Sequence, residues 1–182
     1  MDSRSPSIAC IGVIGRSNNP LHISLFPATG PGYEAERDRL EFSFMLNTCL
    51  DIFEARLPSK GLTHDFGLLH ALDERIAMYG WMTNTGVKFV IVIDIEGTVA
   101  EGGRITAGMG LRNSDLTPAF QALQHAYIKL LRNPFYEPDD HDPKLTKGPT
   151  GSLQIASPNF IREVERIGKA WYPGIRSDEM LK

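Results

Sequence analysis

Two segments of the chain are almost continuously apolar, and both predict strands in the middle of a sheet. Residues 8–14 carry apolar side chains on both alternating faces, and so does the later run of residues 87–93. A strand that is apolar on both faces is covered on both faces. After a turn, residues 21–26 alternate apolar with polar, as a half-buried edge strand in a hairpin does. Residues 27–37 are rich in Pro and Gly and predict a loop.

Between residues 38 and 57 the apolar period changes to steps of three and four, which predicts an amphipathic helix ended by Pro58 and Gly61. Its expected core stripe is Phe42, Met45, Leu46, Cys49, Leu50, Phe53 and Leu57. Three short runs follow, at residues 65–72, 76–83 and 87–93. They predict a three-stranded meander, since Asn84, Thr85 and Gly86 supply a tight turn between the last two.

The second half of the chain predicts two more helices. A glycine-rich connection at residues 95–113 precedes a helix that starts near Asp115 or Thr117, has Pro118 in its first turn and runs to Leu131. Its expected core stripe is Leu116, Ala119, Phe120, Leu123, Tyr127, Leu130 and Leu131. A third helix is capped by Ser157 and Pro158 and carries Phe160, Ile161, Val164, Ile167 and Trp171 at helical spacing.

The order β-β-α-β-β-β-α-α predicts an α+β fold in a single domain spanning residues 1–182. Two doubly covered strands require helices on both faces, so the first helix should pack on one face and the last two on the other. We expect a mixed five-stranded sheet whose first and last strands are adjacent and parallel, because a helical crossover permits parallel pairing. The ordered core should span about residues 8–172, with flexible loops at 27–37, 97–113 and 140–152 and a tail at 173–182.

The charge balance of the 182 residues is mildly acidic, with 19 Lys and Arg against 22 Asp and Glu. The basic residues form no run, which disfavours nucleic acid or an anionic membrane as a partner. No segment approaches the roughly 18 apolar residues of a membrane span, so we expect a soluble cytosolic protein with no transmembrane segment. Cys10 and Cys49 lie in apolar segments and are expected to be reduced, packed thiols.

Two segments have a composition that suggests ligand chemistry, and neither has the required spacing. The glycines at 102–110 lack both GxGxxG and a terminal Gly-Lys-Ser/Thr, which disfavours a phosphate-binding loop. The cluster Asp139, Asp140, His141 and Asp142 lacks the EF-hand pattern, so a solvated turn is favoured over a metal site. With no catalytic Ser-His-Asp or HExxH pattern, we expect no catalytic residues, no cofactor and no metal.

One face of the first predicted helix suggests a protein interface. Five residues fall opposite its core stripe: Leu40, Phe44, Asn47, Thr48 and Asp51. A large aromatic residue among polar groups is typical of a contact surface. Isolated exposed phenylalanines also occur on monomers, and the neighbouring loop could cover this one.

Several strings in the sequence resemble the sedlin family of subunits of the TRAPP (transport protein particle) complex, whose longin-like (SNARE-like) fold has the predicted element order. The matching strings are residues 10–15, 19–21, the pair Leu50 and Asp51, residues 79–94 and residues 133–139. The most specific is the long one at 79–94. The resemblance covers residues 8–26, 38–94 and 115–172.

The resemblance implies a non-catalytic subunit of a vesicle-tethering complex that supports assembly of the complex in ER-to-Golgi and intra-Golgi transport. The implied partners are the other TRAPP subunits, both small core subunits and large subunits of the bigger form, and indirectly Rab-family GTPases. The implied location is cytoplasmic, peripheral at the Golgi apparatus and endoplasmic reticulum. Within the interface face, Asp51 is the family position that the resemblance marks as important.

An alternative is a small-ligand-binding or regulatory domain of longin or profilin type, which predicts a cavity with converging polar groups. A longin domain of a membrane-fusion SNARE is disfavoured, because the sequence has no heptad segment and no terminal anchor.

Overall fold

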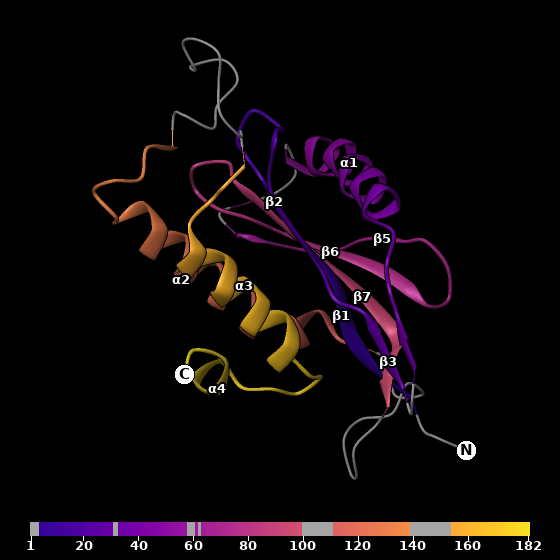
Figure 1. The fold of residues 1–182 in the computed structure, drawn as a ribbon. Coiled ribbons are helices and arrows are strands. Elements are labelled where there is room, and N and C mark those ends of the chain that lie inside the picture. The colour runs from indigo at the N-terminus through magenta and orange to yellow at the C-terminus, as the bar shows by residue number, and fades with distance from the viewer. Residues whose placement is uncertain (1–3, 31–32, 58–60, 62, 100–110, 139–153) are drawn as a thin grey trace.

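The computed structural model describes residues 4–30, 33–57, 61, 63–99, 111–138 and 154–182 (Figure 1). Its strands are β1 (Arg4–Ile14), β2 (Pro20–Leu25), β3 (Ala28–Gly30), β4 (Tyr33–Ala35), β5 (Asp65–Ala71), β6 (Ile76–Met82) and β7 (Lys88–Val99). Its helices are α1 (Arg39–Arg56), α2 (Thr117–Leu131), α3 (Pro158–Ala170) and α4 (Ser177–Met180), with a 3-10 turn η3 (Asn113–Asp115) before α2.

The main sheet has five strands in the order β2-β1-β7-β6-β5, and each neighbouring pair is antiparallel. The prediction that the first and last strands are central and adjacent is confirmed, as is the edge position of β2. The hairpin between β6 and β7 also forms as expected: the Gly86 N–H donates to the Thr83 carbonyl at 3.1 Å, and Gly86 adopts a φ of 85°.

The predicted parallel pairing of β1 with β7 is wrong, so the sheet is antiparallel and not mixed. The reason is the number of chain reversals. The helical crossover α1 starts from β2, which already runs opposite to its hairpin partner β1. It returns the chain so that β5 runs parallel to β2, and the meander then reverses twice before β7. Strand β7 therefore also runs parallel to β2 and opposite to β1.

The helices divide between the two faces of the sheet as the pattern predicts (Figure 1). On one face α1 covers a core that includes Val90 and Val92 of β7. On the other face α2, α3 and α4 cover a core that includes Phe89 and Ile91 of the same strand. The alternation along β7 thus supplies both cores, as expected for a strand with two apolar faces.

Some boundaries differ from the expectation. The predicted loop at 27–37 contains the short antiparallel pair β3 and β4, and β7 extends to Val99 into the predicted glycine-rich connection. Residues 173–182, expected as a tail, include α4, whose Met180 is fully buried against the second core. Leu57 and Leu131 were expected in apolar stripes but are exposed, because Leu57 follows the last residue of α1 and Leu131 is the last residue of α2.

Candidate protein interface

Helix α1 begins at a capped N-terminus and buries one apolar stripe. The Asp38 carboxylate accepts the Leu40 N–H at 2.9 Å, and an acid in the first turn, Glu41, complements the helix dipole. The basic Arg56 stands in the last turn, where the dipole favours a cation. The buried side chains are Phe42, Met45, Leu46, Cys49 and Phe53.

Two strand glycines let α1 lie close to the sheet. A Cβ added to Gly12 of β1 would be 2.6 Å from Leu46 Cδ1, and one added to Gly80 of β6 would be 2.7 Å from Phe53 Cζ. The side chains of the helix therefore fill the space that larger strand residues would occupy.

The structure places all five predicted interface residues on the solvent-exposed side of α1. Leu40 is 64% exposed and Phe44 is 65% exposed, and Asn47, Thr48 and Asp51 are exposed beside them. Their spacing of four, three, one and three residues keeps them on one stripe. The result is an apolar pair at the N-terminal end of the helix followed by a polar half that ends in a carboxylate.

The N-terminal end of α1 is held by a buried ion pair. Asp94 of β7 is fully buried, and its carboxylate lies 2.9 Å from Arg37 Nη2 and 2.7 Å from Arg75 Nε. Arg37 also donates from Nε to the Phe26 carbonyl at 2.6 Å. Burial by itself would raise the pKa of Asp94, but hydrogen bonds from Arg75 and Arg37 outweigh it and hold that pKa below its ordinary value. The residue just before the helix cap is thereby tied to a central strand.

The C-terminal end of α1 is held by side-chain hydrogen bonds. Arg56 donates from Nη1 to the carbonyls of Phe66 and Leu68 in the edge strand β5, at 3.0 and 2.7 Å. Asn18, in the turn between β1 and β2, donates from Nδ2 to Glu54 Oε1 at 3.3 Å. With both ends fixed, the outward face of α1 has a defined orientation.

Sequence reasoning did not find the residues that hold α1. Asp94 gave one usable signal, because it is an acid directly after a run of buried apolar positions and a buried charge requires a partner. Its partners Arg37 and Arg75 are 57 and 19 residues away along the chain, so no local pattern connects them. Arg56 carried no signal beyond its place in a last helical turn.

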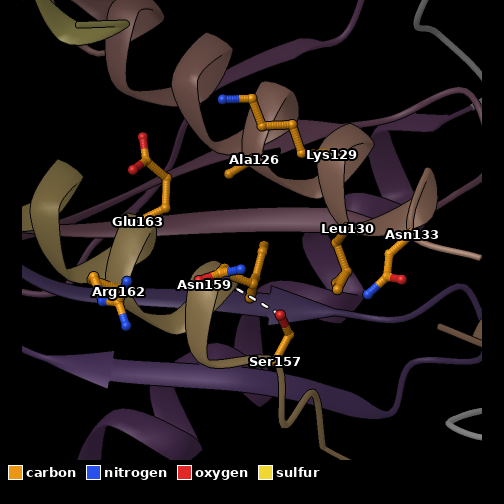
Figure 2. A pocket seen from close by; sticks show the side chains of 9 residues that line it. Ala126, Lys129, Leu130, Asn133, Ser157, Asn159, Arg162 and Glu163 are labelled. Atoms are coloured by element: carbon orange, nitrogen blue, oxygen red, sulfur yellow. Dashed lines mark hydrogen bonds between the residues drawn. The ribbon is translucent and has the colours of Figure 1, made fainter. Parts of the chain in front are cut away.

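The small-ligand alternative predicts a cavity with converging polar groups, and two hollows are relevant to it. One, of about 460 Å³, lies between α2 and α3, and polar side chains from both helices border it (Figure 2). The other, of about 380 Å³, lies between the N-terminal half of β1 and the C-terminal end of α3. In the described ranges no three His, Cys, Asp or Glu side chains form a group able to hold a metal ion.

Several sequence predictions concern residues outside the described ranges, namely the glycines at 102–110 and the cluster at 139–142. Among the helices of the described residues, none combines the length and apolar character needed to cross a bilayer.

Comparison with known proteins identifies the family. The family model described as sedlin matches residues 13–170, a range that includes all of α1 and most residues of both cores. The chain belongs to the sedlin family. The resemblance in the sequence strings is thereby confirmed, and the α+β architecture is that expected for the longin-like fold of sedlin.

Curated relatives of this sedlin-family chain are named trafficking protein particle complex subunit 2-like protein. The one from Mus musculus is 32% identical over 137 residues, which are 72% of this chain and 84% of the relative. The one from Bos taurus is 30% identical over the same shares. The one from Dictyostelium discoideum is 28% identical over 163 residues, 88% of this chain and 95% of the relative. As a member of this family the chain is non-catalytic.

Proposed function

We propose that this protein is a subunit of the TRAPP vesicle-tethering complex and that the outward face of α1 binds another subunit during assembly of the complex. It works in ER-to-Golgi and intra-Golgi transport, at the cytoplasmic surface of these membranes. Its partners are small core subunits and large subunits of the bigger form, and it acts on Rab-family GTPases only through the complex.

The observation that carries this proposal is a large exposed aromatic residue on a helix that is fixed at both ends. Exposed Phe44 and Leu40 supply apolar contact area, and the neighbouring Asn47, Thr48 and Asp51 supply hydrogen-bonding groups. An apolar centre with a polar rim is the usual anatomy of a specific interface. Because the helix is already ordered, binding loses little conformational entropy.

The test compares tagged variants expressed in cells that lack the endogenous protein. Phe44→Ala removes the aromatic anchor, and Asp51→Tyr replaces the carboxylate with a bulky ring. Each should reduce the recovery of co-purifying TRAPP subunits, measured by quantitative mass spectrometry, by about tenfold. Since both side chains are exposed, the melting temperature should change by no more than about 2 °C.

A matched control is Phe135→Ala, which removes a phenylalanine that is 92% exposed beyond the end of α2. It should leave subunit recovery within about twofold of the wild type. Normal recovery with both folded α1 variants would refute the interface on α1. Absence of TRAPP subunits from the wild-type preparation would refute the function itself.

A further inference from the structure

A groove on the other side of the sheet has the composition of a second binding site. It runs between the C-terminal half of α2 and the N-terminal half of α3 and has a volume of about 460 Å³ (Figure 2). Its walls combine buried apolar side chains with polar ones from both helices. The apolar residues are Ala126, Leu130 and Phe160, and the polar ones are Lys129, Asn133, Ser157, Asn159, Arg162 and Glu163.

The charge of this groove is positive although the chain as a whole has a net charge of −3. Lys129 and Arg162 are exposed, and neither has an ion-pair or hydrogen-bond partner within the described part of the chain. The carboxylate of Glu163 is already held by Arg166, whose Nη2 and Nε lie 2.6 and 3.1 Å from Oε1. Two cations that make no ion pair or hydrogen bond within the described residues therefore border the groove. The charge of its carboxylate is balanced mainly by Arg166, and the positive charge of Lys129 also helps to lower the pKa of Glu163.

The amide side chains add groups suited to a polypeptide. Asn133 Oδ1 accepts the Phe135 N–H at 3.1 Å, which leaves its NH₂ group for another partner. Asn159 has no side-chain hydrogen bond to any described residue. An amide side chain both donates and accepts, so it can pair with the N–H and C=O groups of a peptide backbone. The Ser157 hydroxyl caps α3 by accepting the Phe160 N–H at 3.5 Å, and its O–H can still donate into the groove.

We propose that the α2–α3 groove binds an acidic segment of a partner polypeptide. A Glu or Asp side chain of that segment pairs with Lys129 or Arg162, the two asparagines bind its backbone, and an apolar side chain contacts Leu130 and Phe160 at the floor. Charge complementarity selects an acidic occupant. The volume lies in the range of about 300–1,000 Å³ that is typical of binding pockets, well beyond the size of a single small anion.

The groove is a poorer match for an anionic membrane. Membrane-binding surfaces gather about four to eight Lys or Arg residues, whereas among the described residues this groove is lined by two, Lys129 and Arg162. Its apolar contacts are also recessed between two helices.

This proposal is independent of the α1 interface. The α2–α3 groove and α1 lie on opposite faces of the sheet (Figure 1), and the two helical layers cover separate cores. Loss of binding in a variant of one site therefore says nothing about the other site, and the two proposals can be tested separately.

The test is an NMR titration of the full-length ¹⁵N-labelled chain with an acetylated twelve-residue peptide of alternating Glu, Leu and Ser. We expect saturable shifts of the side-chain NH₂ resonances of Asn133 and Asn159. The double variant Lys129→Glu/Arg162→Glu should bind the peptide at least about tenfold more weakly, as reversal of two interfacial charges predicts. A peptide with Gln in place of Glu should bind the wild-type protein more weakly by a similar factor.

Lys169→Glu is the matched control, because Lys169 is an exposed cation on α3 about 10 Å beyond Arg162 along the same helix. It should keep the affinity within about twofold. The proposal is overturned if no resonance of the groove shifts up to about 1 mM peptide, if the Gln peptide binds equally well, or if Lys169→Glu weakens binding as much as the double variant. The proposal would also be overturned if inorganic phosphate shifted the same resonances equally, or if phosphatidylserine vesicles displaced the acidic peptide from the groove.

Discussion

Replacing Asp94 by Asn removes the negative charge that holds the start of α1 and keeps the shape of the side chain. Both guanidinium groups around it would then lose their counter-charge, but the energetic cost would differ between them. The Arg37 side chain is only 10% exposed and cannot be rehydrated without moving, whereas that of Arg75 is 48% exposed and is partly solvated. Most of the destabilisation should therefore come from Arg37.

The expected size follows from the burial of the pair. Removing one partner of a buried ion pair costs about 3–5 kcal/mol. Because Arg75 is half exposed, its share is screened by solvent, and we expect a value near the lower limit, about 3 kcal/mol. For a domain of 182 residues, that lowers the melting temperature by about 6–12 °C. Arg37→Met should likewise cost more than Arg75→Met.

The pH dependence gives a second measurement. The folded-state pKa of Asp94 is lowered, so its stabilising effect is fully present above the unfolded-state pKa of about 4 and is lost as pH falls through the lower folded-state value. The difference in melting temperature between wild type and Asp94→Asn should be constant near neutral pH and should shrink below about pH 4.

Circular dichroism melts of the four proteins at several pH values test this reasoning. A drop of less than about 2 °C for Asp94→Asn at pH 7 would refute it, and so would a difference from wild type that grows on acidification. Asp51→Asn serves as the control, since it removes an exposed carboxylate of α1. It should change the melting temperature by no more than about 2 °C.

Two further predictions concern packing. Gly80→Ala puts a Cβ at 2.7 Å from the fully buried Phe53 ring and should destabilise the fold by about 1–3 kcal/mol in urea unfolding. Gly61→Ala, whose Cβ would have no atom of another described residue within 4 Å, should be neutral to within about 0.5 kcal/mol. Burial raises the pKa of Cys49 to about 12 and raises the pKa of Cys10 as well, so neither thiol should react with Ellman's reagent in the native protein at pH 8, and both should react in urea.

The two central strands and both cores could be predicted from the sequence because burial acts on each residue separately. Consecutive residues of β7, such as Val90 and Ile91, point to opposite faces of the sheet and belong to different cores. Each is apolar because its own side chain is buried. The direction in which β7 runs beside β1 cannot be predicted from the burial of single residues. It depends on how many times the chain reverses between them, and one miscounted reversal inverts the pairing. Short α4 escaped prediction because four residues are too few to show a helical period.

The exposed face of α1 was predictable for the same reason as the cores, since a helical wheel sorts residues by position alone. The groups that orient that face were not predictable. The Asp94 cluster joins segments 19 and 57 residues apart, and Arg56 binds backbone carbonyls, which have no signature in a sequence. Sequence patterns therefore locate a candidate surface, and three-dimensional structure is needed to learn whether it is held rigid.

The arrangement of layers separates binding from stability in this fold. The sheet has one core under α1 and another under α2 and α3. Phe44 and Lys129, which the variants change, belong to neither core, although Ala126, Leu130 and Phe160 of the second core also line the α2–α3 groove. Substitutions at Phe44 and at Lys129 share no contact partner, so their effects on assembly should add in free energy. The two proposed surfaces lie on opposite faces of one sheet, so the protein could bind two neighbours at once, as the proposed role in assembly of a complex requires.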